Sequence, residues 1–416
     1  MNLLIKSAFI IDTKSDFHNS SQDILIEKGK ITKIGEQLDN PNNYKEIVLD
    51  NLHISQGWFD SSVCFGEPGF EDRETIVNGL KTAAKSGFTA VAMQANTNPV
   101  IDSNSDIFFV NSKAQNNAVT LLPIGALTKN SESVDLAELY DMKTAGAVAF
   151  SDYKLPISNP NLLKIALQYA SNFNGLICSF PLEKRISGQG VMNENVMSTS
   201  LGLKGSPNLA EALQIARDLY ILEYTNGKLH IPTISTAESV NLIRQAKLKK
   251  LDVTCSVAIH NLLFLDDYLK EFETTYKVNP PLRTQHDIDA LIEGVKDGTI
   301  DMVTSDHNPI TIEDKKVEFD HAAYGTIGLE SAFGALQTLF TTKKTIALLT
   351  KGKARFGLEN ASIKIGETAN FTLFNPDTKY TFGLEHIVSK SKNSMFLNTD
   401  LKGSVYGIIS NKKISL

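Results

Sequence analysis

The sequence predicts an α/β protein in which a (β/α)8 barrel of the TIM type is joined to a small β-sandwich built from both chain termini. Two observations predict this architecture. Short apolar runs alternate with amphipathic, helix-like stretches over about 270 residues, as they do in parallel barrels. Strand-like segments with turn signals dominate both ends of the chain instead. We therefore expect the sandwich to comprise residues 1–52 and 360–416, and the barrel to comprise residues 53–359.

The elements follow in order along the chain. Apolar alternation predicts strands in the first fifty residues, and Glu27-Lys28-Gly29-Lys30 carries a hairpin signal. From residue 57 the pattern changes to helices followed by strands. The helix–strand pairs are 75–87 with 88–95, 161–175 with 176–180, 210–227 with 228–235, 236–251 with 252–259, and 287–299 with 300–309. After about residue 360 the strand pattern returns, at 362–375 and 404–416.

Composition narrows the class of protein. The net charge of −6 gives no support to a nucleic-acid or anionic-membrane partner. No apolar run approaches the ~20 residues that span a bilayer, and the N-terminus lacks the features of a signal peptide. Three widely spaced cysteines, Cys64, Cys178 and Cys255, favour a reducing compartment over a disulfide framework. We expect a cytoplasmic protein.

In a barrel of this kind the chemistry lies where strands end and the following loops begin. One such stretch is GWFDSSVCFGEPGF (57–70), and several long strings surround the other strand ends. These strings are EPGFEDRETIVNGLKTAAKSGFTAVAMQANTNPVIDS, GQGVMNENVMSTSLGLKGSP, LHIPTISTAESVNLIRQAK, VNPPLRTQHDIDALIEGVKDGTIDMVTSDHNP and YGTIGLES. In order and spacing, through nearly the whole chain, they resemble the longer bacterial type of dihydroorotase in the amidohydrolase superfamily.

The resemblance implies a zinc-dependent hydrolase whose ligands are four histidines, a bridging carboxylate and an aspartate that shuttles the proton. By position, the bridging carboxylate matches Asp152 and the shuttling aspartate matches Asp306. The four histidine positions hold Ser62, Cys64, Phe180 and Thr233. A phenyl ring coordinates nothing and hydroxyls are weak neutral ligands, whereas zinc sites need three or four N, S or carboxylate ligands. We therefore expect no metal, with Asp152, Asp306 and Cys64 as the candidate remnants of the site.

The substrate-binding positions implied by the resemblance are partly retained. Asn96 and the segment that begins at Asn279 match the family. Gly66 and Ile310 stand where the family has an arginine and a histidine that hold the substrate carboxylate. A bidentate guanidinium contact is thereby lost.

Two hypotheses from different classes follow. The first is a non-catalytic homologue that acts as a structural or regulatory partner of aspartate carbamoyltransferase, as inactive relatives do, and that itself forms a homo-oligomer. The alternative is an active dihydroorotase or other cyclic amidohydrolase, with a remodelled zinc site or none, that works through Asp306, Asp152, Cys64 and His260. Convergence of these four groups at the barrel mouth would favour the alternative. We expect His230 and His307 to be scaffold residues.

Overall fold

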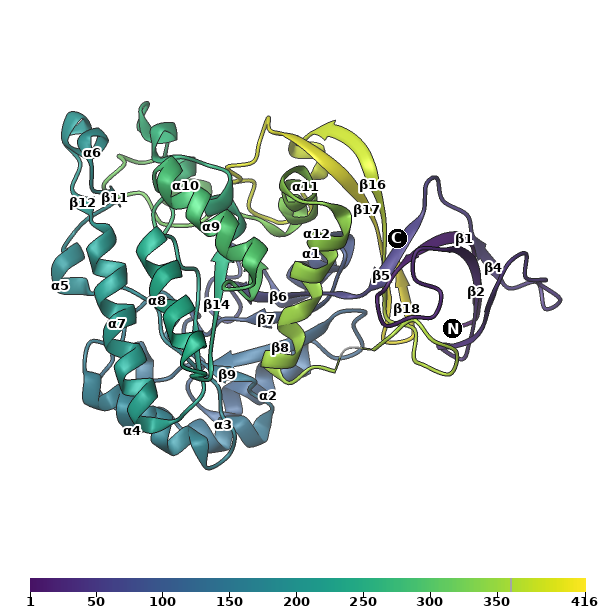
Figure 1. Ribbon diagram of the computed structural model, residues 1–416, viewed down its shortest axis with the longest axis horizontal. Helices are drawn as coiled ribbons and strands as arrows, with labels where there is room; N and C mark the ends of the chain where they lie inside the picture. The colour runs from purple at the N-terminus through teal and green to yellow at the C-terminus, as the bar shows by residue number, and fades with distance from the viewer. Residues whose placement is uncertain (360) are drawn as a thin grey trace.

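The computed structural model describes residues 1–359 and 361–416, and it confirms the predicted fold class (Figure 1). A parallel barrel surrounded by helices forms the larger part, and strands from both chain ends form a sandwich beside it. Among the described residues, no helix has the length and apolarity to cross a membrane.

The barrel sheet has eight strands within the described residues, in the order β6-β7-β8-β9-β10-β13-β14-β15. Their bounds are β6 (Trp58–Val63), β7 (Phe88–Met93), β8 (Thr120–Gly125), β9 (Ala149–Phe150), β10 (Ile177–Cys178), β13 (Leu229–Ile231), β14 (Val253–Ala258) and β15 (Met302–Thr304). Neighbouring strands pair in parallel. A parallel bridge between Val63 and His307 joins the last strand to the first, so the sheet closes.

Helices cover the outside of the barrel (Figure 1). The longer ones are α1 (Ile76–Lys85), α2 (Asn104–Lys113), α3 (Leu139–Ala145), α4 (Pro160–Ser171), α7 (Asn208–Thr225), α8 (Ala237–Leu248), α9 (Gln285–Asp297), α11 (Leu329–Leu339) and α12 (Thr342–Thr350). Short elements in the loops at the mouth are α5 (Lys184–Ser187), β11 (Met192–Asn193), α6 (Val196–Leu201), β12 (Gly205–Ser206) and α10 (Ile312–Lys315). Helix α1 shows how the sequence sets these bounds. The Thr75 side chain caps its first turn by accepting from the Asn78 N–H, and Gly87 follows its end with a left-handed φ of 90°.

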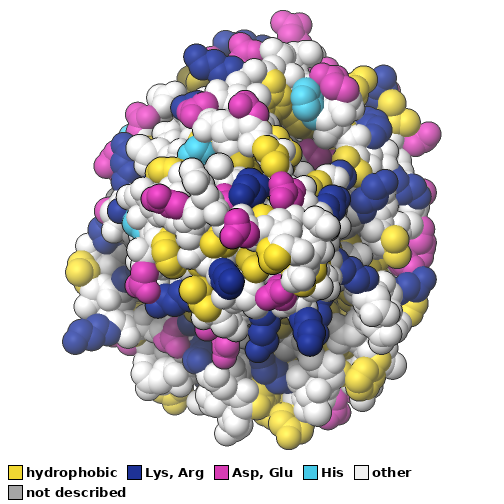
Figure 2. Space-filling view, turned by 90° about the vertical axis from the view of Figure 1, so that its right-hand side faces the viewer, with side chains coloured by type: hydrophobic (Ala, Val, Ile, Leu, Met, Phe, Trp, Pro, Cys, Tyr) yellow, Lys and Arg dark blue, Asp and Glu magenta, His cyan; other side chains and the backbone are white. Residues whose placement is uncertain are grey.

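Strands from both chain ends share the sandwich sheet. Its order is β18-β17-β16-β5-β1-β2-β3, with β4 paired to β1. The bounds are β1 (Leu3–Ile11), β2 (Ser21–Glu27), β3 (Lys30–Gly35), β4 (Lys45–Ile47), β5 (His53–Gln56), β16 (Phe371–Thr381), β17 (Asp400–Ser410) and β18 (Lys413–Ser415). Because β5 pairs with both β1 and β16, the sheet continues to Gln56, past the boundary expected after residue 52. The other expected boundary, at residue 360, lies outside the described residues. Acidic and basic side chains are intermixed on the face at this end of the molecule (Figure 2).

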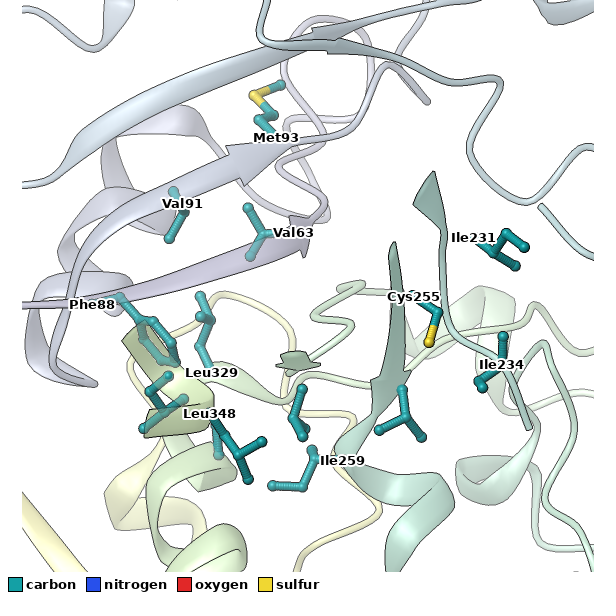
Figure 3. Close-up of a cluster of buried hydrophobic side chains, with 14 of the residues drawn as sticks. Val63, Phe88, Val91, Met93, Ile231, Ile234, Cys255, Ile259, Leu329 and Leu348 are labelled. Carbon is teal, nitrogen blue, oxygen red and sulfur yellow. The ribbon is translucent and has the colours of Figure 1, made fainter. Parts of the chain in front are cut away.

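Two apolar layers position the barrel mouth. Side chains such as Val63, Val91 and Met93 belong to the core between the strands and the outer helices (Figure 3). A smaller cluster that includes Phe59, Cys178 and Phe356 packs separately from this core. Ser62 lies near the end of β6 and Cys64 directly follows the strand, and both side chains are buried.

Candidate functional site

Three residues at strand ends of the barrel hold left-handed backbone conformations. Tyr153, Thr233 and Asp306 have φ values of 55°, 47° and 48°, and they follow β9, β13 and β15. Such a φ is unfavourable for a bulky or β-branched residue and costs on the order of 1–3 kcal/mol. Strained residues of this kind cluster at functional sites. The barrel mouth therefore keeps a specialised backbone geometry.

Asp306 is paired with Lys154, a residue that the sequence analysis did not single out. The Lys154 Nζ lies 2.7 Å from the Asp306 Oδ2, and the two side chains are 11% and 2% exposed. The other carboxylate oxygen, Oδ1, has no hydrogen-bond partner in the described part of the chain. Burial raises the pKa of Asp306 above its ordinary value, and the nearby Lys154 charge opposes this shift. Asp306 is thus a desolvated carboxylate whose charge is balanced by an ammonium group.

Cys64 is a buried thiol beside this ion pair. Its backbone N–H donates to the His307 carbonyl at 2.8 Å, which fixes its position at the end of β6. Burial raises the pKa of the Cys64 thiol to about 12, and the Asp306 charge contributes in the same direction. Tyr153 and Asn96 lie beside the thiol, although the Tyr153 hydroxyl has no hydrogen-bond partner of normal geometry among the described residues. With no cation bound to it, Cys64 is protonated at neutral pH, which makes it a poor nucleophile.

Asp60 ties the first barrel strand to the last. Its Oδ1 accepts from the Ser62 N–H at 2.9 Å and from the Thr304 hydroxyl, and its Oδ2 accepts from the Ser305 N–H at 2.8 Å. The hydroxyl of Ser62 in turn accepts from the Gln94 Nε2 at 3.2 Å. These contacts hold the loop that carries Asp306.

Asp152, the expected bridging carboxylate, is hydrogen-bonded to the loop after β8 rather than to the residues around Asp306. Its Oδ1 accepts from the backbone N–H groups of Leu127 and Thr128, both at 2.9 Å, and its Oδ2 accepts from the Thr128 hydroxyl at 2.6 Å. Both oxygens therefore hold the loop after β8. The side chain that the loop after β9 directs towards Cys64 and Asp306 is that of Tyr153, one residue further along.

The remaining histidine positions hold buried side chains. Phe180 and Thr233 are each 2% exposed, and the Thr233 N–H donates to the Ser256 hydroxyl at 3.1 Å. Within residues 1–359 and 361–416, no group of three or more His, Cys, Asp or Glu side chains is arranged to hold a metal ion. Lys154 holds Asp306, and the four histidine positions offer two hydroxyls, a phenyl ring and one thiol, so the residues present do not fit a zinc site.

Three buried histidines lie near strand ends of the barrel, and they differ in whether their ring nitrogens have hydrogen-bond partners. His307 is a scaffold residue, because its Nδ1 accepts from the N–H groups of Gly328 and Leu329 at the start of α11, and burial lowers its pKa to about 4. His230 packs against Thr254 and burial lowers its pKa to about 3. His260 is fully buried and both of its ring nitrogens lack partners among the described residues. Its pKa is lowered to about 3, chiefly by burial and further by the charge of Lys154, which places it near that ammonium.

A cavity of about 550 Å³ opens at the barrel mouth, and Lys154 and Asn279 are among the side chains that line it. The expected arginine position cannot hold a long side chain in this conformation. A Cβ atom on Gly66 would lie 2.1 Å from the Phe70 carbonyl oxygen, because the loop turns back at this point. Ile310 is buried and its carbonyl accepts from the Ser391 hydroxyl at 2.7 Å.

The four groups named for an active alternative therefore converge only in part. Lys154 pairs with Asp306 and its charge acts on Cys64 and His260, whereas Asp152 bonds to the loop after β8. Lys154 and Tyr153 were missed by sequence reasoning. They directly follow Asp152 in the loop after β9. Because barrel loops carry the residues of the mouth, each of the three successive residues 152–154 was a candidate.

The barrel with its terminal β-sandwich defines the class of fold that this chain shares with solved hydantoinases. The L-hydantoinase of Arthrobacter aurescens superimposes with a TM-score of 0.85 over 99% of this chain and 95% of its own, at 20% identity. A D-hydantoinase from Thermus sp. superimposes with a TM-score of 0.82 over 100% of this chain and 95% of its own, also at 20% identity. At this identity the likeness shows the fold.

Sequence comparison identifies the family. A family model described as Dihydro-orotase-like matches residues 53–239. The dihydroorotase of Pelotomaculum thermopropionicum is 39% identical over 98% of this chain and 97% of its own length. The dihydroorotase of Geotalea daltonii is 37% identical over 100% of this chain and 99% of its own length. This chain belongs to the dihydroorotase family.

Proposed function

We propose that this chain is a non-catalytic dihydroorotase homologue of pyrimidine biosynthesis that acts as a structural or regulatory partner of aspartate carbamoyltransferase. The observation that carries the proposal is the composition of the barrel mouth. Where the family resemblance implies histidines, the chain has Ser62, Cys64, Phe180 and Thr233. The one carboxylate retained at the centre, Asp306, is engaged by Lys154.

The chemistry of ring opening supports the proposal. Hydrolysis of a cyclic amide needs an activated nucleophile, polarisation of the carbonyl and stabilisation of the developing oxyanion. Cys64 is protonated at neutral pH, and Asp306 is ion-paired rather than free to accept a proton from water. Loss of one such function commonly costs orders of magnitude in rate. We therefore expect turnover close to the uncatalysed background.

The intact scaffold is the reason to propose a partner. Arg283 is 2% exposed and donates to Asn193, Ser206 and Ser235, so a fully buried polar network still braces the loops beside the mouth. A fully satisfied buried network of this kind rigidifies the loops and specifies one folded arrangement of them. A role as a folded surface for aspartate carbamoyltransferase fits this retention.

The second candidate is an active dihydroorotase or other cyclic amidohydrolase with a remodelled site. The comparisons favour it, because relatives that are 36–39% identical over nearly their whole length carry the name dihydroorotase. The left-handed conformations of Tyr153, Thr233 and Asp306 also fit a site that still functions.

The first experiment measures zinc in protein purified without chelators from zinc-supplemented cells, followed by dihydroorotate hydrolysis and its reverse. The dihydroorotase of Pelotomaculum thermopropionicum, prepared in parallel, is the positive control. We expect less than about 0.1 equivalent of zinc per chain, too little for a structural or catalytic site, and no turnover above background. Zinc near one equivalent together with turnover would establish the second candidate.

The partner is tested separately. The chain is mixed with aspartate carbamoyltransferase from the same organism and examined by sedimentation velocity. We expect a complex heavier than either component and higher carbamoyltransferase activity or stability in its presence. Independent sedimentation of the two proteins, with no change in the carbamoyltransferase, would refute the partnership.

A further inference from the structure

Asp306 is buried at the barrel mouth, so its negative charge needs a positive partner. Its carboxylate is 2% exposed, and an isolated buried charge is strongly unfavourable unless it is paired. A metal ion is the partner that the family resemblance implies at this position. Here the partner is an amino group supplied by the chain.

Lys154 is the central charge of this group of residues. It follows β9 in the chain, and its Nζ lies 2.7 Å from Asp306 and 5.3 Å from the centre of the Tyr153 ring. Its charge also acts on Cys64 and His260. It adds to the lowering of the His260 pKa and partly offsets the rise that burial causes in the Cys64 pKa. The residues that pair with this ammonium or feel its charge thus follow four different strands of the barrel, β6, β9, β14 and β15.

We propose that the Lys154 ammonium is the resident cation of this barrel mouth, that it takes over the charge-balancing role of a metal ion, and that it opposes the binding of a divalent cation beside Asp306. This inference rests on the proposed absence of a metal site. A divalent ion at Asp306 would meet the repulsion of a nearby ammonium in a poorly solvated place, where charges interact strongly. It would also have to displace the existing ion pair. Restoring histidines alone is therefore insufficient to restore metal affinity.

The experiment restores two ligands and varies the lysine. The variants are S62H/C64H, in which two imidazoles two residues apart at the end of β6 join Asp306 as ligands, and S62H/C64H/K154M, which also removes the ammonium. Zinc affinity is measured by competition with a chromophoric chelator, and Co²⁺ spectra report the coordination. We expect zinc to bind at least about tenfold more tightly to the triple variant. Affinities within threefold of each other would overturn the inference.

Two controls isolate the position of the charge. Lys184 is an exposed lysine that also lines the mouth cavity, so S62H/C64H/K184M removes a charge of the same kind without touching Asp306. We expect its zinc affinity to equal that of S62H/C64H. K154M alone should gain no zinc site, because Ser62 and Cys64 remain. Equal tightening by K184M and K154M would assign the effect to general charge rather than to the ion pair.

A second measurement keeps the inference testable if the histidine variants do not fold. K154M leaves Asp306 buried without its cation, so its melting temperature should fall. Adding D306N removes the unpaired charge, and K154M/D306N should melt about 2 °C or more above K154M. A failure of D306N to rescue K154M would refute the charge-balancing role. Zinc in the unmodified protein would instead refute the proposed function, so the two failures are distinguishable.

Discussion

Lys315 donates from its Nζ to the backbone carbonyl of Lys277 at 2.9 Å. The same amino group donates to the Ala323 carbonyl at 2.9 Å, and the Lys277 Nζ donates to the carbonyls of Phe319 and Asp320 at 2.6 and 3.0 Å. Both lysine side chains are buried. Two buried lysines thus connect the residues before Pro280 with the loop that follows Asp306.

The first prediction concerns the pH dependence of stability. Burial, aided by the charges of Lys277 and Lys154, lowers the pKa of Lys315 from 10.5 to about 7. Between these two values the unfolded chain binds the extra proton, so the free energy of unfolding should rise with pH from 7 to 10.5. K315M removes this contribution, which is on the order of 5 kcal/mol across the window. Urea unfolding at several pH values measures it. K316M, which changes the exposed neighbour, should keep the wild-type slope.

The second prediction concerns motion of the same loop. K277M removes two hydrogen bonds to the carbonyls of Phe319 and Asp320 and the contact of the ammonium with the Tyr324 ring, whose centre is 4.8 Å away. We expect amide hydrogen exchange of residues 318–325 to accelerate about tenfold or more, as for a segment that opens locally. K316M again serves as the control. Unchanged exchange in K277M would mean that the loop is held by its other contacts.

The third prediction compares the loss of stability when a buried arginine and when a surface arginine is replaced. Arg283 is buried with Glu211, 3.8 Å away, and donates to Asn193, Ser206 and Ser235. R283M should destabilise the protein by about 3–5 kcal/mol, because it leaves buried acceptors and a carboxylate without their partner. Arg244 pairs with Asp297 at the surface, so R244M should cost about 1 kcal/mol or less. Chemical denaturation measures both. Equal costs would show that the Arg283 network is dispensable.

The fourth prediction concerns thiol reactivity. Burial raises the pKa of each cysteine, Cys64, Cys178 and Cys255, to about 12, and all three are free and buried. In the native protein at pH 8 we expect none of them to be alkylated by iodoacetamide, and all three to react in denaturant. Mass spectrometry of the labelled protein checks this. Rapid labelling of Cys64 in the folded protein would indicate an exposed thiolate and would strengthen the remodelled-enzyme candidate.

The sequence patterns predicted the barrel because helix and strand periodicities repeat strongly along it. They missed α2, where Phe108 and Phe109 are exposed beside the buried Ile107 and Val110, so that no clear apolar stripe marks the helix. They also missed β9, which is two residues long and too short for alternation to detect. Tertiary packing defines these elements rather than local pattern.

The candidate site was predicted where a motif fixes the position, as for Cys64 and Asp306. It was missed where a backbone turn decides which side chain faces inward. The loop after β9 passes through Tyr153 with a φ of 55°, and it carries Asp152, which bonds to the loop after β8, and Lys154, which pairs with Asp306. Those two partners are 152 positions apart in the chain. No local spacing relates them.

The fifth prediction tests the new placement of Asp152. D152A leaves three donors without their acceptor, the N–H groups of Leu127 and Thr128 and the Thr128 hydroxyl, and should cost about 2–4 kcal/mol of stability. D152N keeps one carbonyl oxygen for both N–H groups and presents an amide to the hydroxyl, so it should cost about 1 kcal/mol or less. Urea unfolding compares the two variants. A carboxylate that bridges metal ions would give the opposite pattern, in which asparagine and alanine are equally harmful and metal content falls with both. Because both oxygens of Asp152 hold loop backbone and a hydroxyl, we expect the graded loss of stability and no change in metal content.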